Sequence, residues 1–455
     1  MKAFFLSILM LFSGSLCSQL CFGPLSSYSL GGYPASICTD DFNGDGILDL
    51  ATANSMTSSI TLWFGDGTGT FTTNATFTTG PGPWALACSD YNLDGEMDLA
   101  VSNVNSAGYT ILLGNGTGGF SSTNFYAVNW PTKLIAAGKF TSDNFPDLVL
   151  GSYSGDSIAL LHGTGMGTFS LAATYFSGGA IESITAADFD GDTFLDLAVP
   201  NWTLPPTINV LMGTGTGYFS QPTSIPVNTL IGHLAHGDFN GDMMEDLMAC
   251  HTLSKTVSYL LGIGTGSFVN TGTSYTVGDW PVFSATADVD NDGKTDLAVC
   301  NLYSENISIL LGLNTGSFQP AITYSAGLRP ISLCTGYFNG DQKTDLAVVD
   351  FTLNSVNLLL SCLSNPTTSV VENEEDSEIR VFPNPSGNTV HINSNLKIAA
   401  IWLYNSYGML LNTKLKNTET ELDISDLPDG LYLIRIENEG KKHISEVPLI
   451  KMSND

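Results

Sequence analysis

The sequence predicts an all-β protein: a seven-bladed β-propeller closed by its own N-terminal strand, followed by a small β-sandwich. Three observations lead to this prediction. The motif Asp-Phe-Asn-Gly-Asp-Gly-Ile-Leu-Asp-Leu at residues 41–50 recurs, with changes, seven times at intervals of 49 or 50 residues. Short apolar runs and glycine-rich turns fill each interval, and helical periodicity is not evident. The last interval lacks a final strand, which the first residues of the chain can supply.

Residues 1–18 have the composition of a signal peptide. Lys2 gives a positive end, residues 3–12 are apolar, and residues 16–18 offer a cleavage site before Gln19. A lipoprotein would use Cys17, but the preceding leucine fits that alternative poorly. No other apolar stretch is long enough to span a bilayer. We therefore expect an exported protein that does not span the membrane.

The N-terminal segment is predicted to complete the last blade. Residues 22–34 align without gaps on residues 318–330, which form the outer strand of the sixth blade and the entry to the seventh. In this register Cys21 and Cys362 flank the turn between strands three and four, so we predict a Cys21–Cys362 disulfide that closes the ring. The alternative is two separately buried thiols. The pairing of the other cysteines after the signal peptide stays open: Cys38, Cys88, Cys250, Cys300 and Cys334.

The propeller is expected over residues 19–365, and its sixth repeat illustrates how each blade is built. In the sixth copy, four short apolar runs are separated by a polar loop, a polar connection and a glycine turn, which is typical of a propeller blade. The strands are expected at residues 281–287, 297–300, 307–311 and 318–325.

The loop between strands one and two carries oxygen ligands at the spacing of a calcium loop. Side chains at positions 1, 3, 5 and 9, with the backbone carbonyl at position 7, would surround one ion. Five copies keep this pattern, with the ligands Asp41, Asn43, Asp45, Ile47, Asp49, Asp90, Asn92, Asp94, Glu96, Asp98, Asp188, Asp190, Asp192, Phe194, Asp196, Asp238, Asn240, Asp242, Met244, Asp246, Asp288, Asp290, Asp292, Lys294 and Asp296. The alternative is a polar turn without an ion.

We expect calcium at about five sites, because an all-protein oxygen cage suits calcium better than magnesium. The third copy has Lys139 at position 1, and we expect no ion there because its ammonium can replace the cation. The seventh copy has Tyr337 at position 1 and is doubtful. The net charge of −29 agrees with cation binding, since most acidic residues lie in these loops. The same charge disfavours nucleic acid as a partner.

The repeated motif, followed by a strand and a Gly-Thr-Gly-x-Phe turn, resembles the FG-GAP or VCBS-type repeat over residues 22–362. That family forms the seven-bladed propeller of integrin alpha chains and of many bacterial surface proteins. The resemblance implies calcium in the loop between strands one and two. It does not imply one function, because members include adhesins, lectin-like binders and polysaccharide lyases.

The C-terminal segment differs in composition from the repeats. Residues 366–378 are rich in glutamate and indicate an acidic linker. Residues 379–455 alternate apolar and polar side chains, as expected of an antiparallel sandwich. Phe-Pro-Asn-Pro at 382–385, Leu-Tyr-Asn-Ser-Tyr-Gly at 403–408, Asp-Gly-Leu-Tyr at 429–432 and Lys451 resemble the type A C-terminal sorting domain of type IX secretion. The resemblance implies handling by that machinery and a location in the medium or on the outer cell surface; cleavage of the domain stays open.

The face opposite the ion loops is the candidate ligand face. Aromatic rings beside amides suit sugars, because ring faces stack and hydroxyls find hydrogen-bond partners. The candidate residues are Tyr33, Asn54, Asn103, Trp130, Asn201, Trp202, His251, Trp280, Asn301 and Arg329. The alternative is that the asparagines cap turns and the tryptophans pack between blades.

We therefore expect a binding or adhesion module for a glycan or a cell-surface protein. A lyase-like enzyme on the same propeller is one alternative, since His233, His236 and His251 lie near one another in sequence, but no nucleophile motif accompanies them. A structural surface-layer component is another. The ligand and the oligomeric state do not follow from the sequence.

Overall fold

The computed structural model describes residues 20–153, 155–362, 379–382, 389–394, 398–405, 410–415, 421–425, 427, 430–438 and 444–451. The chain divides into two compact units, Met1–Pro366 and Thr367–Asp455. The described residues form strands and turns with no helix, which confirms the all-β prediction. The predicted signal peptide at residues 1–18 and the acidic linker at residues 366–378 lie outside the described residues.

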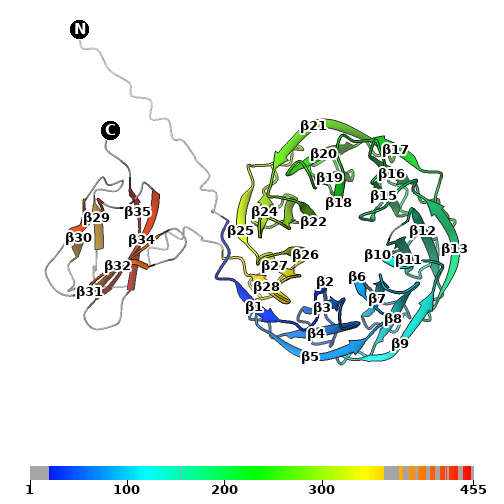
Figure 1. The fold of residues 1–455 in the computed structure, drawn as a ribbon, viewed down its shortest axis with the longest axis horizontal. Helices are drawn as coiled ribbons and strands as arrows, with labels where there is room; N and C mark the ends of the chain where they lie inside the picture. The colour runs from blue at the N-terminus through cyan, green and yellow to red at the C-terminus, as the bar shows by residue number, and fades with distance from the viewer. Residues whose placement is uncertain are drawn as a thin grey trace, which may run out of the picture. The chain divides into compact units, whose positions relative to one another are not determined.

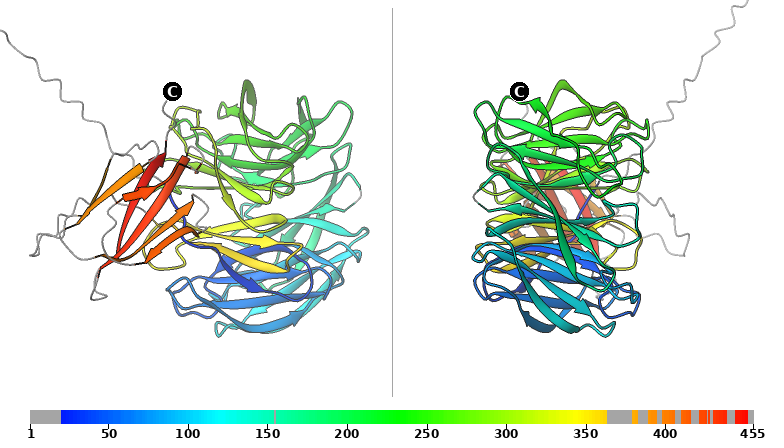
Figure 2. Two further views of the ribbon diagram at one scale, coloured as in Figure 1. Left: turned by 60° about the vertical axis from the view of Figure 1, so that its left-hand side comes forward. Right: turned by 90° about the vertical axis from the view of Figure 1, so that its right-hand side faces the viewer.

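The first unit is a ring of seven four-stranded antiparallel sheets around a central axis (Figure 1). The right-hand view of Figure 2 shows this ring from its edge, with strands running from one face to the other. The innermost strands are β2 (Pro34–Asp40), β6 (Pro83–Ser89), β10 (Thr132–Gly138), β14 (Thr185–Ala187), β18 (Ile231–Gly237), β22 (Pro281–Ala287) and β26 (Pro330–Gly336).

The second strand of each blade is buried along its whole length. These strands are β3 (Asp49–Asn54), β7 (Asp98–Asn103), β11 (Asp147–Ser152), β15 (Asp196–Asn201), β19 (Asp246–His251), β23 (Asp296–Asn301) and β27 (Asp345–Asp350). Their apolar residues point to both faces, because each sheet is covered by a neighbouring blade on either side. Leu50 of the first blade, for example, shares a buried cluster with Phe338 and Ala347 of the seventh.

The outer half of each blade is a hairpin around a glycine-rich turn. The third strands are β4 (Ser59–Gly65), β8 (Gly108–Gly114), β12 (Ser157–Gly163), β16 (Thr207–Leu211), β20 (Thr256–Gly262), β24 (Asn306–Leu310) and β28 (Ser355–Leu359). The fourth strands are β5 (Phe71–Thr78), β9 (Phe120–Ala127), β13 (Phe169–Phe176), β17 (Thr223–Pro226), β21 (Phe268–Thr276), β25 (Ile322–Ser325) and β1 (Ser26–Ser29).

Strand β1 closes the ring, as the alignment of the N-terminal segment predicts. It pairs antiparallel with β28, from Ser26 opposite Leu358 to Ser29 opposite Ser355, and Figure 1 shows the two side by side. The last blade therefore combines both ends of the repeat region, and its outer edge is not left unpaired.

The second unit contains two sheets. One has the order β29 (Ile379–Phe382), β30 (Thr389–Ser394) and β33 (Glu421–Asp423); the other has the order β32 (Leu410–Leu415), β31 (Ile398–Asn405), β34 (Gly430–Asn438) and β35 (Ile444–Lys451). Val390, Ile401 and Ile434 belong to one buried cluster. The small sandwich itself stays a prediction.

Two pairs of cysteines are brought together in the ring. The Sγ atoms of Cys38 and Cys88, on the innermost strands of blades one and two, lie 2.6 Å apart. The N–H of Cys362 donates to the carbonyl of Cys21 at 3.0 Å, and burial and the Cys21 thiol raise the pKa of Cys362 to about 11. The sequence left the partner of Cys38 open, because side-chain direction between blades cannot be read from spacing.

We predict that the exported protein contains Cys21–Cys362 and Cys38–Cys88 disulfides, because export permits oxidation and both pairs are close. Peptide mapping under non-reducing conditions should recover both linked peptides, with Cys250, Cys300 and Cys334 alkylated only after unfolding. Free thiols at Cys38 and Cys88 in protein purified from the medium would contradict the second pair.

Candidate metal centres

The seven acidic loops follow the innermost strands and lie on one face of the ring. In the first loop, Asp41 accepts hydrogen bonds from the N–H groups of Gly44, Asp45 and Gly46 at 2.7, 3.2 and 2.7 Å. Asp45 in turn accepts from the N–H of Ile47 at 2.8 Å. The acidic side chains therefore hold the loop in a compact turn, in which their carboxylate oxygens face the backbone N–H groups of the same loop.

The residue after position 5 adopts a left-handed conformation in all five ligand-bearing loops. It is glycine in three of them, with φ of 82° at Gly46. Thr193 and Met243 take the same place with φ of 77° and 64°, where a side chain is strained. The loops of blades four and five therefore keep the turn although they lack its favoured residue.

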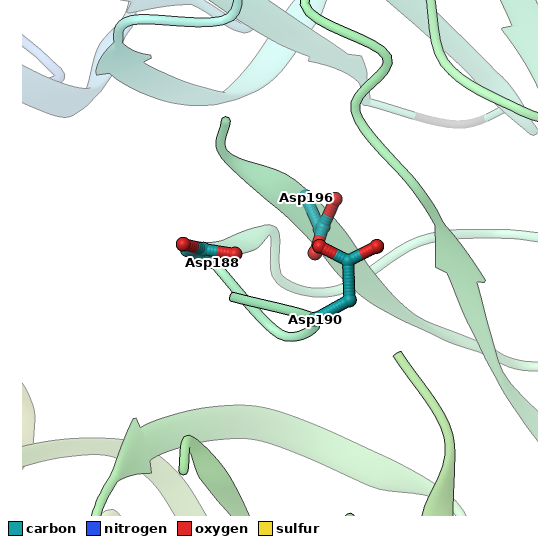
Figure 3. Close-up of side chains that lie close together, drawn as sticks. All are labelled: Asp188, Asp190 and Asp196. Atoms are coloured by element: carbon teal, nitrogen blue, oxygen red, sulfur yellow. The ribbon is translucent and has the colours of Figure 1, made fainter. Parts of the chain in front are cut away.

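Three carboxylates converge in two of the loops. Asp188, Asp190 and Asp196 each offer an oxygen within 4.8 Å of the others (Figure 3). Asp288, Asp290 and Asp296 form the equivalent group in blade six. Burial and then the neighbouring carboxylates raise the pKa of Asp190 and Asp290. Blades one, two and five have an asparagine at position 3, so an amide oxygen takes the place of the third carboxylate there.

The aspartate at position 9 has a second role that sequence reasoning missed. In all seven blades it is 0% exposed, as Asp49, Asp98, Asp147, Asp196, Asp246, Asp296 and Asp345. In blade one, Oδ2 accepts the N–H of Phe42 and Oδ1 accepts the N–H of Gly65, at 3.1 and 3.0 Å. Equivalent pairs of bonds recur in the other six blades. We call this pair of bonds the carboxylate bracket.

The carboxylate bracket joins the start of the acidic loop to the end of the third strand. Burial raises the pKa of Asp49 and Asp98 to about 6, and of Asp196 and Asp296 to about 7. Part of the signal for this role was present in the sequence, because position 9 remains aspartate in the third and seventh copies, where position 1 is Lys139 or Tyr337.

The acidic loops also contact the next blade. In five blades a glycine of the turn between strands three and four donates its N–H to the carbonyl of position 2 in the preceding loop, as Gly118 does to Phe42 at 3.0 Å. A Cβ at Gly118 would lie 1.8 Å from Phe64, and its φ of 76° also favours glycine. The loop's shape therefore affects the blade interface as well as its own ligands.

The third and seventh loops lack the converging carboxylates. Lys139 and Tyr337 are exposed at position 1. The third loop is instead tied to blade four, since the N–H of Ser142 donates to the carbonyl of Gly215 at 3.1 Å. In the seventh loop, Lys343 lies 3.9 Å from Asp341.

On the opposite face, the candidate amides are engaged within their own blades. Asn54, Asn103, Asn201, Asn301 and His251 are buried. Their side chains bond to strand hydroxyls or to the entering backbone: the amide of Asn103, for example, donates to the carbonyl of Gly80 at 3.0 Å. These contacts agree with the alternative in which the asparagines hold turns.

The aromatic candidates are divided between packing and an open cavity. Trp130 packs in the core between blades two and three, and the ring of Tyr33 lies 5.1 Å from that of Phe351. A cavity of about 550 Å³ lies at one end of the ring's central axis, and its lining includes Trp202, Trp280 and Arg329. We call it the mouth cavity. In blade one the cavity is lined by Ala35, Ser36 and Ile37, near the start of β2, whereas the acidic loop follows the end of that strand. The cavity therefore opens on the face opposite the loops.

The carboxylate bracket can be tested in blade three, where no ion is expected. Asp147→Asn removes one acceptor and places an amide donor against a buried N–H, so we expect a loss of about 2 kcal/mol in the free energy of unfolding. Asp143→Asn in the same loop alters an exposed side chain and should change it by less than about 0.5 kcal/mol. Urea unfolding with a calcium chelator present measures both, and equal stability of the two variants would refute the bracket.

Comparison with known proteins agrees with this architecture. The FG-GAP-like repeat profile matches residues 41–101, 139–199, 238–299 and 288–348, and the profile of a secretion system C-terminal sorting domain matches residues 380–450. No curated protein sequence gives a significant match.

Solved structures are similar to this chain at low identity, and the first one named here shares the fold. BBS1N, crystallised in complex with ARL6DN, is 14% identical with a TM-score of 0.55, over 76% of this chain and 98% of that one. A lectin from Agrocybe aegerita that recognises non-reducing terminal N-acetylglucosamine is 16% identical, with a TM-score of 0.49 over 72% and 95%. PorZ, a surface component of the type IX secretion system of Porphyromonas gingivalis, is 14% identical, with a TM-score of 0.45 over 89% and 58%.

The repeat profile covers about half of the chain, the described ring has seven blades, and the sorting profile covers nearly all of the second unit. The chain therefore belongs to the FG-GAP-like repeat family of β-propellers and carries a type IX secretion C-terminal sorting domain.

Proposed function

We propose that this protein is a calcium-stabilised binding module that works outside the cell. Its sorting domain indicates export to the cell surface or the medium by the type IX machinery. Among the described residues, no helix has the length and apolarity that crossing a membrane requires. The observation that supports a binding role is the mouth cavity, because side chains from all seven blades line it. Such concave, largely apolar sites with a few polar groups are typical of ligand binding.

Calcium fits the donor set of the acidic loops. The converging groups in blades four and six consist only of carboxylates, and hard oxygen donors are what calcium prefers. The carboxylates that raise one another's pKa would be stabilised in their charged form by a cation. The ion would be held by the side chains of positions 1, 3, 5 and 9 and would supply positive charge beside the blade interface. Its role is structural.

No specific observation favours the lyase alternative. The three histidines that suggested it are each hydrogen-bonded within the fold: His233 to Ser284, His236 to Glu245, and His251 to Ser258 and Thr229. Burial lowers the pKa of His233 to about 4, so this imidazole is neutral at ordinary pH. A binding role needs no catalytic group and accounts for the cavity directly.

Calcium should raise the melting temperature of the full chain relative to a sample in chelator. At a concentration about 100 times the dissociation constant, one bound ion adds about 2.7 kcal/mol to the free energy of unfolding. Differential scanning calorimetry measures the shift, and magnesium should give a smaller one. Asp190→Asn, which gives blade four the donor set of blade one, should keep part of the shift; Asp188→Ala should lose more. Equal melting with calcium and with chelator would contradict the proposal.

The calcium effect should depend on pH. Burial raises the pKa of Asp196 and Asp296 from 3.8 to about 7, so the ion-free folded state binds protons more tightly than the unfolded chain. That contribution to stability is full below pH 3.8 and is lost as pH rises through about 7. Ion-free protein should therefore lose stability between about pH 4 and pH 7, and calcium should restore it at the higher pH.

His233 acts in the opposite sense, because its pKa is lowered and its contribution falls as pH drops below 6.5. The quantity to compare is therefore the difference in melting temperature between calcium and chelator at each pH. If this difference in melting temperature shrinks as pH rises, protons do not compete with the ion for the buried carboxylates.

A further inference from the structure

The innermost strands share an irregularity in strand pairing, at residues that line the mouth cavity. In blades one, three, five, six and seven, the pairing of the first strand with the second skips a single residue: Ala35, Lys133, Gly232, Val282 and Ile331. In blade two the skipped pair begins with Trp84. In blade four the equivalent residue is Glu182, directly after the isolated bridge of Ile181 with Asn201. A β-bulge of this kind turns a side chain out of the regular alternation.

These seven positions all line the mouth cavity. We call Ala35, Trp84, Lys133, Glu182, Gly232, Val282 and Ile331 the bulge ring. Elsewhere the blades repeat one another closely, but here every blade has a different residue. A bulge sets the backbone and not the side chain, although at Gly232 the neighbouring Thr252 also limits which residue fits. The variation makes one sector of the bulge ring polar and aromatic and the other small and apolar.

The polar sector contains an ion pair between neighbouring blades. The Lys133 ammonium contacts the Glu182 carboxylate, with the two side chains 15% and 25% exposed. Because the charges compensate each other, the pair can donate and accept further hydrogen bonds without adding net charge to the cavity. Trp84 precedes this pair around the ring. Trp202 is fixed beside it by a hydrogen bond from its Nε1 to the carbonyl of Ile231 at 2.7 Å. The Arg329 guanidinium, which also lines the cavity, lies over the ring of Tyr303 at 5.7 Å.

The opposite sector has a buried hydroxyl without a partner and a glycine. The Oγ of Ser332 is buried, with the residue 3% exposed, and has no hydrogen-bond partner among the described residues. A buried hydroxyl without a partner is costly, and Ser332 is one of the residues that line the cavity. At Gly232 a Cβ would lie 2.7 Å from Thr252, so a side chain has no room there.

We propose that the bulge ring is the specificity site of this propeller and binds the end of a neutral saccharide. A sugar ring has an apolar face for an indole and vicinal hydroxyls for a lysine–glutamate pair. All seven blades surround the cavity, so a saccharide chain enters along the central axis of the ring and places its terminal sugar in the cavity. The volume accommodates about one or two sugar rings. This inference rests on the proposed binding function and names its ligand class and residues.

The experiment uses the full exported chain with calcium present. A glycan array identifies the preferred saccharide, and titration calorimetry measures its affinity for wild type and variants. Trp84→Ala should weaken binding at least about tenfold, a loss of about 1.4 kcal/mol. The double variant Lys133→Met with Glu182→Met should do the same; replacing a half-buried ion pair by apolar residues is commonly tolerated by the fold. Its calcium-dependent melting verifies folding.

The matched control is Lys255→Met. Lys255 pairs with Asp279 outside the cavity, and this variant should bind the saccharide as wild type does. Unchanged affinity in Trp84→Ala and in the double variant would overturn the assignment of the site. Binding of uronate-bearing glycans alone, or of no glycan, would overturn the ligand class. Neither result touches calcium-dependent melting or binding of another partner, so failure of this inference is distinct from failure of the proposed function.

Discussion

The propeller depends on the buried aspartate that each blade places after its acidic loop. One carboxylate accepts an N–H from the start of the loop and another from the end of the third strand, and it is fully removed from solvent. Three segments of one blade are thereby fixed at a single point. The loop held in this way then receives a hydrogen bond from the glycine turn of the next blade. Order within a blade and contact between blades therefore have a common origin.

This arrangement explains why so many carboxylates are compatible with a stable ring. A chain with a net charge of −29 would be expected to repel itself. Some carboxylates are stabilised by hydrogen bonds from backbone N–H groups, and those in blades four and six converge so that they could hold a metal ion. In our proposal calcium supplies the remaining positive charge. Blade three keeps the bracket without the ligands, which separates the structural role of the motif from its metal-binding role.

Much of the fold could be predicted from the sequence because it repeats. The period, the seven blades and the closing strand β1 all follow from comparing the chain with itself, and the structure agrees. The site was harder to predict. Asn103 and Asn301 were candidates for a ligand face, but their amides are used within the blade, since side-chain direction depends on pairing register. Trp84, Lys133 and Glu182 were not candidates, because a bulge that shifts register by one residue leaves no signal in a single sequence.

The two faces of the ring therefore have different requirements. The loop face keeps the position-9 aspartate in every blade, because every blade forms the same carboxylate bracket. In our proposal the bulge ring needs differences, because seven identical positions would not fix one orientation of an asymmetric ligand. The most direct test of the account is elemental analysis of the purified, exported protein after dialysis against metal-free buffer. The account predicts about five calcium ions per chain, one for each ligand-bearing loop. Less than one equivalent of calcium in folded protein would contradict it.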